Sequence, residues 1–402
     1  MINVNQAVIF VGGLGTRLGA ITKRVPKPLI KIDGKPFIDH LIKKLSQNGI
    51  EEVILLTGYK RNIFKKKYHN KILFNNTKVI CSEEKKTLGT GGALLNARKH
   101  LKQFFFLING DTYFDFNIHD LKHNFLNNKK YIVNFALKEK KNKRYSKVLL
   151  KKNKIIEFST KKKSTFINTG HYLVKKKILK FIKKKISSLE LDVFSKLAKK
   201  GMLKGKIFNK KFNKFIDIGI PQDLNRADKF IKRSNKKGAV FLDRDGVINK
   251  NLGYVHKIKD IIWRKKIFKF LKQIKDNNFY LIVISNQSGV GRGYYSEKTL
   301  NILHDWMNKQ IMKNYSCIDK FYYSPYYSNS KIKKYSKAKF NRKPQIGLFN
   351  KAKKEFNLEI KNCYMIGDKE IDMEFAKKCK IKGFRLNFSD DIFIVLNKIL
   401  KK

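Results

Sequence analysis

The chain has 402 residues, of which 42% are hydrophobic, so it can bury the cores of two globular domains, and no apolar run reaches the length of a membrane span. Its net charge of +60 comes from lysine runs scattered along the whole sequence, a pattern typical of a solvated surface rather than of a nucleic-acid interface. The first ten residues do not resemble a signal peptide and the four cysteines show no paired spacing, so we expect a cytoplasmic protein with reduced thiols.

In the first half of the chain, short apolar runs alternate with helical patterns, which predicts an α/β domain with parallel strands. AVIFV (7–11) predicts a strand, and the apolar spacing between Pro36 and Gly49 predicts a helix. VILLTG and FFFLINGD predict further strands. The region 145–175 differs, because KVLLKKNKIIEF predicts a hairpin and FINTGHYLV another strand. This insertion would form one wall of a sugar pocket.

The second half repeats the α/β alternation after a polar segment. PQDLNRADKFI predicts a helix that ends near KRSNKKG (232–238), which we interpret as a linker between domains 1–231 and 239–402. The strands expected after the linker are AVFLD, YLIVIS, KFYYS and CYMIGD, with helices between them. Each of these strands ends in a polar residue. Ligands bind at the carboxyl ends of strands in open α/β sheets, so we expect chemistry there.

Several phosphate-binding features follow the first strands in order. GGLGTRL (12–18) and LGTGGAL (88–94) are glycine loops that let backbone N–H groups approach a phosphate. Lys27 lies between two prolines and, with Arg17, would supply positive charge to a triphosphate. Asp111 follows a strand in NGD and Asp217 lies in FIDIG, and two carboxylates suit Mg²⁺. Each feature alone fits an ordinary turn or cap, but the ordered set predicts a nucleotide site.

Over residues 5–231 this set resembles the sugar-1-phosphate nucleotidyltransferases, with the N-x-G of residues 168–170 as a further matching piece. The resemblance implies a Rossmann-like domain with a mixed, mostly parallel sheet. It implies that a sugar 1-phosphate attacks the α-phosphate of an NTP and releases pyrophosphate. By this resemblance Arg17 and Lys27 bind and polarise the triphosphate, Asp111 and Asp217 hold Mg²⁺, Asn168 lies near the sugar, and Gly12, Gly13, Gly15, Gly89 and Gly91 lie near the nucleotide. The family often has a Glu–Lys pair after the middle hairpin, where this chain has Thr160 and Lys161, so the glutamate contact to the sugar is missing from the pattern.

A second set of residues begins in VFLDRDGVIN (240–249). Asp243 ends a predicted strand, and a carboxylate can attack phosphorus to form an aspartyl-phosphate. Asp245 follows two residues later and could protonate the leaving alcohol, then activate water. Ser285 stands at the end of the next strand, where a hydroxyl can hold a phosphate oxygen.

The remaining members of this set lie further along the chain. Lys343 in NRKP offers a point charge for the nucleophile and for the transferred group. Asp368 in IGDKEIDM suits Mg²⁺, with Asp372 one helical turn later. A D-x-D pair alone is common in exposed loops, but all these pieces in this order predict a phosphatase site.

Across residues 238–402 the second set resembles the haloacid dehalogenase-like phosphatases, and more narrowly the D-glycero-D-manno-heptose 1,7-bisphosphate phosphatases and the related histidinol-phosphatase group. The narrower match depends on FLDRDGVIN, GY (253–254), SNQSGVGRGYYSE, NRKPQIGLF and MIGDKEIDM. The resemblance implies a Rossmannoid fold, and the short distances between motifs predict a minimal cap made of loops. It assigns substrate contacts to Ser285, Asn286, Arg292 and Arg342, and metal contacts to Asp243, Asp245 and Asp368.

Relatives of this group often carry a zinc loop, Cys-x-His followed by Cys-x-Cys before Arg-Lys-Pro. Here Ser324 and Tyr326 replace the first pair, and Lys339 and Asn341 replace the second. None of these is a zinc ligand in this setting, so we predict no structural zinc. We expect packing of the loop tyrosines to order it instead: Tyr323, Tyr326, Tyr327 and Tyr335.

Together the two resemblances predict a bifunctional, Mg²⁺-dependent enzyme of activated-sugar synthesis, acting for example in lipopolysaccharide or S-layer glycan formation. The C-terminal domain would convert a heptose 1,7-bisphosphate into heptose 1-phosphate, which the N-terminal domain would couple to a nucleotide. Guanine follows from the resemblance to heptose- and mannose-type transferases, since the loops do not identify the base. The expected partners are small-molecule substrates, with no nucleic acid and no membrane, and homo-oligomerisation stays open.

Three alternatives remain at this point. The enzyme could act on mannose 1-phosphate or another hexose 1-phosphate, with an unrelated phosphatase substrate. The basic charge could serve nucleic-acid binding, which would leave the catalytic sets unexplained. One domain could be an inactive scaffold, although both residue sets are intact.

Overall fold

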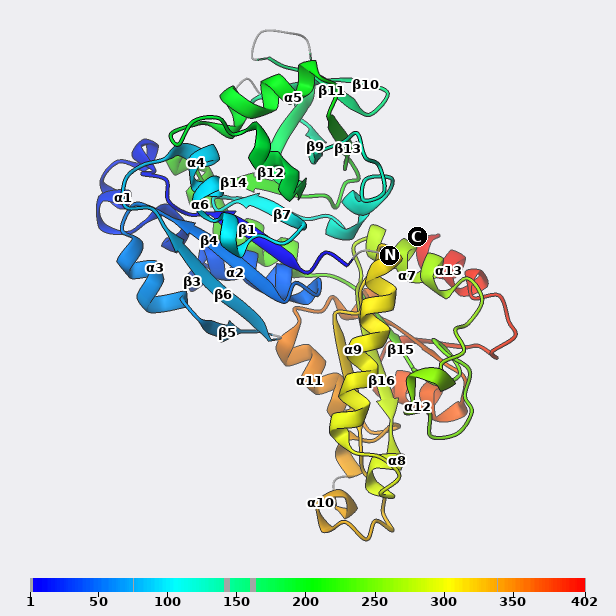
Figure 1. Ribbon diagram of the computed structural model, residues 1–402. Coiled ribbons are helices and arrows are strands. Elements are labelled where there is room, and N and C mark those ends of the chain that lie inside the picture. The colour runs from blue at the N-terminus through cyan, green and yellow to red at the C-terminus, as the bar shows by residue number, and fades with distance from the viewer. Residues whose placement is uncertain (1–2, 75, 141–144, 160–163, 338, 402) are drawn as a thin grey trace. The chain divides into compact units, whose positions relative to one another are not determined.

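The computed structural model describes residues 3–74, 76–140, 145–159, 164–337 and 339–401 (Figure 1). The chain divides into two compact units, residues 2–232 and 233–402. Within the described ranges no helix combines the length and the apolar character that crossing a bilayer requires.

The N-terminal unit is built on a ten-stranded sheet. In spatial order its strands are β10 (Lys147–Lys151), β11 (Lys154–Ser159), β13 (Leu203–Ile207), β9 (Val133–Glu139), β12 (Phe166–Lys175), β7 (Phe104–Asn109), β1 (Gln6–Phe10), β4 (Glu52–Thr57), β6 (Thr77–Glu83) and β5 (Lys71–Leu73). The strands from β7 to β6 are parallel, whereas β12 runs antiparallel to both β7 and β9. The sheet is mixed, as predicted, but its parallel part is smaller than expected. The hairpin β10–β11 and the return strand β12 have no helical crossover, and such neighbours must be antiparallel.

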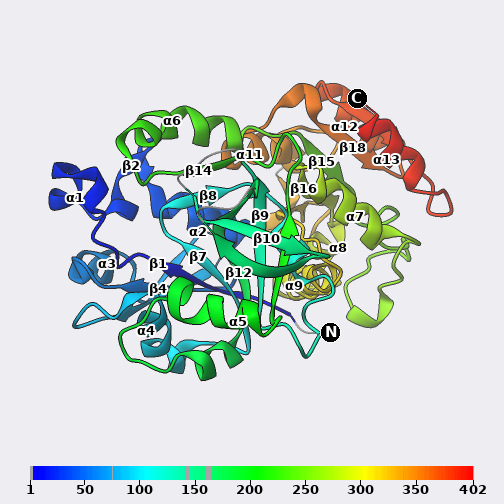
Figure 2. The same ribbon diagram turned by 90° about the horizontal axis from the view of Figure 1, so that it is seen from above.

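Helices cover both faces of this sheet (Figure 2). The helices are α1 (Ala20–Arg24), α2 (Phe37–Gln47), α3 (Arg61–Tyr68), α4 (Gly89–Asn96), α5 (Ser195–Lys199) and α6 (Pro221–Asn235), with a π-helical segment at Leu189–Phe194. One core joins α2, α3 and α6 to the face that carries Ala7 and Ile9 of β1. The other joins α4, α5 and the π-helical segment to the face that carries Val8. This alternation along β1 is the period of two that a strand buried on both faces requires.

The helix predicted between Pro36 and Gly49 is α2, and the prediction is confirmed. Its residues Ile38, Leu41, Ile42 and Leu45 are buried along one face, and Pro36 stands at its N-cap. Two small antiparallel pairs complete the unit: β2 (Lys31–Ile32) with β3 (Lys35–Pro36), and β8 (Thr112–Phe114) with β14 (Phe215–Asp217).

The C-terminal unit contains a five-stranded, fully parallel sheet. Its order is β17 (Lys320–Ser324), β16 (Tyr280–Asn286), β15 (Ala239–Leu242), β18 (Tyr364–Gly367) and β19 (Lys382–Arg385). The first strand of the unit, β15, is therefore central, and the strand order reverses on either side of it. Such a switch point opens a crevice at the carboxyl end of the strand, where Asp243 follows.

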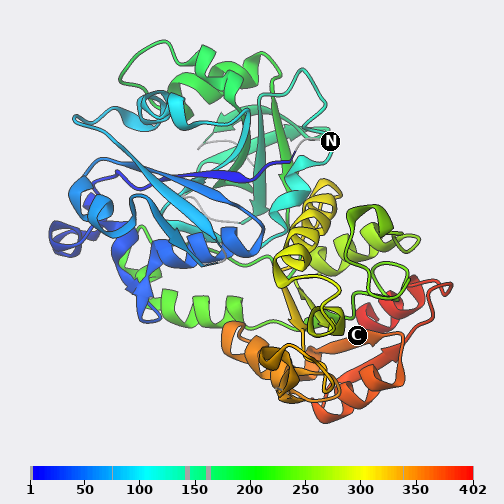
Figure 3. The same ribbon diagram turned by 60° about the horizontal axis from the view of Figure 1, so that its bottom comes forward.

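Alternating residues of β15 point into two separate cores. Val240 and Leu242 face α7 (Ile267–Asp276), α9 (Glu297–Lys313) and α13 (Phe393–Leu400). Ala239 and Phe241 face α11 (Gly347–Glu355) and α12 (Glu370–Lys378). In Figure 3 the orange helices α11 and α12 can be followed on one side of this sheet and the green α7 and yellow α9 on the other. The remaining helices are short: α8 (Ser288–Gly291) and α10 (Lys333–Ser336).

The segment expected to be a linker is partly helical. Helix α6 continues through residue 235, and β15 begins at residue 239, so only residues 236–238 lie between the two elements. The side chains of residues 232–235 are all polar, which is why they resemble a loop in the sequence, although Ser234 is buried in the folded unit. The connection from β15 to α7 holds a single 3₁₀ turn (Ile258–Asp260), in agreement with the predicted minimal cap.

Candidate active sites

The N-terminal unit has a cavity of about 360 Å³ at the carboxyl ends of β1 and β7. Phe10 and Asn109, the last residues of these strands, both line it. Most of the residues predicted for nucleotide binding are on its wall: Gly12, Gly13, Gly15, Arg17, Lys27, Gly89 and Asp111. These residues lie up to about a hundred positions apart in the sequence. The structure brings them together at the carboxyl ends of parallel strands, where ligands bind in α/β sheets.

Each glycine loop contains a glycine at which a side chain would not fit. Gly15 has a φ of 69°, and a Cβ there would lie 2.9 Å from Cγ2 of Thr22. Gly89 has a φ of 71°, and a Cβ there would lie 2.5 Å from the carbonyl oxygen of Ser187. Gly91 is not among the lining residues, and its N–H donates to the same carbonyl at 2.8 Å. Gly91 therefore fixes the loop against a neighbouring segment rather than facing the cavity.

Lys27 and Asp111 form an ion pair on the cavity wall, with Nζ 2.5 Å from Oδ2. The Lys27 side chain is buried, so its charge is only weakly screened by water. Asp217 lies opposite Thr112 in the β8–β14 ladder, one residue along from Asp111, and accepts the N–H of Gly219 at 2.6 Å. Asp217 in this ladder and Asp111 just before it offer carboxylate oxygens, the ligand type that a hard cation prefers.

Asn168 lies behind the cavity wall rather than on it. Its Nδ2 donates to the Tyr172 hydroxyl at 2.9 Å, and its Oδ1 accepts the N–H of Gly170 at 3.0 Å. Gly170 packs against Asn109, because a Cβ there would lie 2.5 Å from Nδ2 of Asn109. Asn168 thus holds Gly170, which packs against Asn109 on the cavity wall. Thr160 and Lys161 lie outside the described residues.

Two glutamates line this cavity that the sequence motifs did not include. Glu84 follows β6, and burial raises the pKa of its carboxyl, while Oε2 accepts the N–H of Leu88 at 3.0 Å. Its place at the end of a parallel strand was the signal that could have identified it. Glu190 comes from the π-helical segment and accepts a hydrogen bond from Oγ1 of Thr90 at 3.0 Å. No motif in the sequence points to Glu190.

The C-terminal unit has a second site, centred on the residue that follows β15. Lys343 is buried, and its Nζ lies 3.2 Å from Oδ1 of Asp243 and 2.5 Å from Oδ1 of Asp372. The backbone of Lys343 is fixed by Asn286, whose Oδ1 accepts its N–H at 3.0 Å and whose Nδ2 donates to its carbonyl at 3.1 Å. Asn286, expected to contact substrate, thus also positions the lysine.

The charges of Asp243 and Lys343 favour a reactive carboxylate at Asp243. Burial raises the pKa of Asp243 to about 6, and the ammonium of Lys343 opposes this shift. Burial alone would lower the pKa of Lys343, but Asp243 and Asp372 together raise it. The lysine therefore stays protonated and keeps Asp243 ionised near neutral pH, the form in which a carboxylate can act as a nucleophile.

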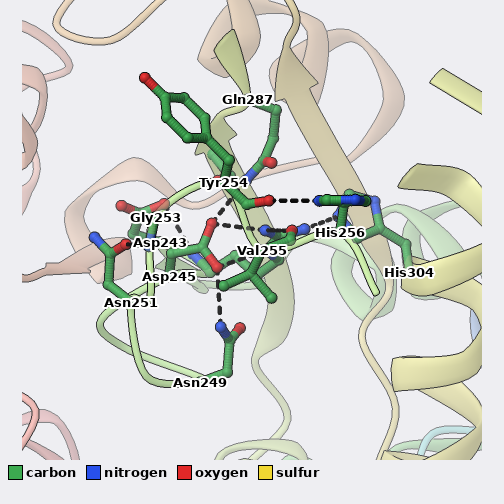
Figure 4. A network of polar contacts seen from close by, with 12 residues as sticks. Asp243, Asp245, Asn249, Asn251, Gly253, Tyr254, Val255, His256, Gln287 and His304 are labelled. Atoms are coloured by element: carbon green, nitrogen blue, oxygen red, sulfur yellow. Dashed lines mark hydrogen bonds and ion pairs between the residues drawn. The ribbon is translucent and has the colours of Figure 1, made fainter. Parts of the chain in front are cut away.

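The carboxylate of Asp245 is the centre of a separate hydrogen-bond network (Figure 4). The fully buried Arg244 donates to both of its oxygens, from Nε to Oδ1 at 3.0 Å and from Nη2 to Oδ2 at 2.7 Å. Asn249 donates to Oδ1 and Gln287 to Oδ2, each at 2.9 Å. Gln287 also donates to Oγ of Ser285 at 2.8 Å. Four donors fix the direction of this side chain.

The donor set at Asp243 fits a magnesium ion. Carboxylate oxygens of Asp243, Asp368 and Asp372 lie within 4.8 Å of one another. Oδ1 of Asp368 is buried without a hydrogen-bond partner, and burial raises the pKa of this carboxyl, so a cation beside it would stabilise its ionised form. Among the described residues the cluster contains Asp372, which the expected metal set omitted, and not the carboxylate of Asp245.

Arg292 and Arg342 lie together beside this site. The guanidinium of Arg292 stacks on Tyr327, with its carbon 3.6 Å from the ring centre. Arg342 donates from Nη1 to the carbonyl of Tyr326 at 3.2 Å. Burial lowers the pKa of Arg342, and the charge of Arg292 lowers it further. The side chain of Lys339 is outside the described residues, and hydroxyls of the loop tyrosines bind Glu297.

Two protein families match the chain, one in each of its two compact units. Residues 6–234 match the nucleotidyl transferase family, and residues 241–384 match the family described as polynucleotide kinase 3 phosphatase.

Curated relatives are similar to one part of the chain each. A D-glycero-alpha-D-manno-heptose-1,7-bisphosphate 7-phosphatase from Photorhabdus laumondii is 37% identical over 147 residues, 37% of this chain and 80% of the relative. A D-glycero-alpha-D-manno-heptose 1-phosphate guanylyltransferase from Campylobacter jejuni is 43% identical over 119 residues, 30% of this chain and 53% of the relative. The match therefore spans about half the length of that guanylyltransferase. A crystal structure of HddC from Yersinia pseudotuberculosis, complexed with GMP-PN, is 30% identical with a TM-score of 0.48, and covers 56% of this chain and 99% of HddC.

Proposed function

Because the chain belongs to the nucleotidyl transferase family through residues 6–234, and to the D-glycero-D-manno-heptose-1,7-bisphosphate 7-phosphatases through its second half, we propose that it is a bifunctional enzyme of activated-heptose synthesis. The C-terminal domain removes the C7 phosphate of D-glycero-D-manno-heptose 1,7-bisphosphate. The N-terminal domain then transfers GMP from GTP to heptose 1-phosphate and releases pyrophosphate. The product would supply a lipopolysaccharide or S-layer glycan, and the four free, buried cysteines favour a cytoplasmic location.

In the phosphatase reaction, a carboxylate oxygen of Asp243 attacks the C7 phosphorus and the bond from phosphorus to the sugar oxygen breaks. Asp245 gives its proton to the leaving oxygen, then takes a proton from the water that hydrolyses the aspartyl-phosphate. Lys343 and the hydroxyl of Ser285 hold the transferred phosphoryl group. A magnesium ion held by Asp243, Asp368 and Asp372 would neutralise phosphate charge, with Asp245 as a further expected ligand.

In the transferase reaction, an oxygen of the sugar 1-phosphate attacks the α-phosphorus of GTP and pyrophosphate leaves. Arg17 on the cavity rim and Lys27 on its wall bind the triphosphate and offset the charge that develops on the leaving group. Asp111 and Asp217 would hold a magnesium ion, which would offset the negative charge of the reacting phosphates. The guanylyltransferase relative supports guanine as the base.

One observation supports the combination most strongly. A single chain carries the Asp243–Lys343 site of a sugar-bisphosphate phosphatase and the Lys27–Asp111 cavity of a nucleotidyltransferase. Loss of the C7 phosphate leaves the anomeric phosphate in place, and this is the group that a nucleotidyltransferase consumes. The two reactions therefore follow one another chemically.

The decisive experiment supplies the whole protein with both anomers of heptose 1,7-bisphosphate and each of the four common NTPs. We expect release of one phosphate and formation of GDP-heptose, identified by mass spectrometry. Asp243→Asn should abolish phosphate release yet still couple added heptose 1-phosphate to GTP. The proposal would be refuted if the protein hydrolysed neither anomer of heptose bisphosphate, or if it transferred the nucleotide only to mannose 1-phosphate.

A further inference from the structure

Three side chains of the C-terminal unit converge on Glu297, the first residue of α9. The Tyr323 hydroxyl of β17 donates to Oε2 at 2.9 Å, and the Tyr335 hydroxyl of α10 donates to Oε1 at 2.7 Å. Lys334 donates to the same Oε1 at 3.0 Å. Burial would raise the pKa of Glu297, but these bonds outweigh it and lower the pKa, so the carboxylate is ionised and the bonds are charge-assisted.

These contacts anchor residues 325–337, which we call the tyrosine strap. Within the strap, the N–H of Tyr327 donates to the carbonyl of Tyr335 at 3.0 Å, so the anchor at α10 also fixes its beginning. The strap lies tightly on α8, because a Cβ on Gly291 would lie 2.6 Å from the carbonyl oxygen of Pro325. Glu297 therefore helps to hold the first turn of the strap in place, together with Ser330, whose hydroxyl donates to the Gly291 carbonyl of α8.

Both arginines beside the site bind to this first turn. Arg292 stacks on the Tyr327 ring, and Arg342 donates to the Tyr326 carbonyl. They thus contact neighbouring residues of the strap, and among the described residues neither arginine forms an ion pair with a carboxylate. Two adjacent cations without an acidic partner favour binding of an anion. Lys343 is held independently, by Asn286 and Asp372, and not by the strap.

We infer that Glu297 is a positioning residue: it holds the tyrosine strap so that Arg292 and Arg342 form a subsite for the phosphate that the phosphatase does not cleave. This inference rests on the proposed function, since it assigns the subsite to a bisphosphate. It separates substrate capture, which depends on the strap, from the phosphoryl transfer at Asp243, which does not.

The test is Glu297→Gln in the full-length protein, with Glu355→Gln as the matched control. Glu355 accepts a hydrogen bond from Tyr322 at 2.6 Å, and Tyr322 precedes Tyr323 on β17 and points to the opposite face of the sheet. Each substitution thus removes one charged acceptor of a β17 tyrosine. We expect Glu297→Gln to raise KM for heptose 1,7-bisphosphate roughly tenfold, the equivalent of one charge-assisted hydrogen bond, with kcat almost unchanged. Hydrolysis of p-nitrophenyl phosphate, which has no second phosphate, should be unaffected, and Glu355→Gln should change neither reaction.

A double variant tests whether Glu297 acts through the arginines. Arg342→Ala should raise KM for the bisphosphate by itself, and Glu297→Gln in that background should add little. Additive effects, or an equal loss of kcat on both substrates, would overturn the inference and indicate a merely structural role.

Limited trypsin digestion tests the strap without any substrate. The strap contains the exposed residues Lys331, Lys333, Lys334 and Lys337. Cleavage there should be several-fold faster in Glu297→Gln than in the wild type or in Glu355→Gln, because the anchor is lost. An unchanged cleavage rate would contradict the inference. If the wild type hydrolyses p-nitrophenyl phosphate but not heptose bisphosphate, while Glu297→Gln still accelerates cleavage, the proposed function fails and the role of Glu297 as anchor stands.

Discussion

Nζ of Lys27 lies 2.5 Å from Oδ2 of Asp111, so the buried cation of the nucleotide cavity is paired with a residue expected to bind metal. A triphosphate with its magnesium ion brings both a cation for Asp111 and an anion for Lys27. Under the proposed function, the pair would receive a metal–nucleotide complex, with the cation beside Asp111 and the phosphates beside Lys27.

This relationship predicts the effect of Lys27→Ala. We expect nucleotide transfer to fall on the order of 10²–10³-fold, because a charge that stabilises the leaving pyrophosphate is lost. Pyrophosphate release with GTP and heptose 1-phosphate is the measurement. Phosphate release from heptose bisphosphate should stay at the wild-type rate, and a parallel loss of both activities would indicate misfolding instead.

Gly246 gives a sharper test of the phosphatase site. It has a φ of 90°, and a Cβ there would lie 2.2 Å from Oδ2 of Asp368. Gly246→Ala should displace Asp368 and lower phosphatase activity on the order of 10²-fold. Gly253→Ala is the control, since Gly253 has a φ of 72° but a Cβ there would have no neighbouring atom within 4 Å. That variant should show only the backbone strain, about 1–3 kcal/mol in the free energy of unfolding.

The variant Asp368→Asn should show that nucleotide transfer and phosphate release depend on different metal sites. Removal of metal with EDTA should abolish both activities, and added Mg²⁺ should restore both in the wild type. In Asp368→Asn, Mg²⁺ should restore nucleotide transfer alone, because the substitution removes the negative charge of a buried carboxylate from the phosphatase cluster only. Full phosphatase activity in this variant would exclude Asp368 as a ligand.

The buried side chain of His304 leads us to predict how the stability of the C-terminal domain depends on pH. Burial lowers the pKa of His304 well below its usual value of 6.5, and the charge of Arg244 lowers it further. The unfolded chain takes up a proton below about pH 6.5 that the folded domain does not, so stability falls as pH decreases, by about 1.4 kcal/mol per pH unit. His304→Phe should make this decline shallower. Urea unfolding between pH 7 and 5 can be followed by tryptophan fluorescence, since both tryptophans, Trp263 and Trp306, lie in this domain. An unchanged slope would rule out His304 as the source.

The sequence predicted those features that depend on local pattern. The apolar spacing of α2 and the strands that precede Asp111 and Asp243 were recognisable, because burial imposes a period of 3.6 or 2 on neighbouring residues. The end of α6 was not, since its last residues are polar and only tertiary packing extends the helix to Asn235.

Residues that act through distant contacts were beyond prediction. Glu190 approaches Thr90 across a hundred positions, and Glu297 meets Tyr335 only after the chain has folded back over α8. Asp372 was visible as part of a motif, but its bond to Lys343 depends on two elements of the folded domain. A single sequence does not show which residues far apart along the chain will come into contact in the folded protein.

Each sheet takes all of its strands from one uninterrupted stretch of the chain, with the last of the N-terminal sheet ending at Ile207 and the first of the C-terminal sheet beginning at Ala239. On a ribosome, the nucleotide-binding half would be complete while the 170 residues from 233 to 402 are still being made. At ordinary rates of synthesis that interval is on the order of 10–30 s, longer than most domains need to fold. The first half can therefore bury its core before the second half, with its own exposed apolar strands, leaves the ribosome. We therefore expect this order of emergence to reduce mispairing between the strands of the two α/β sheets.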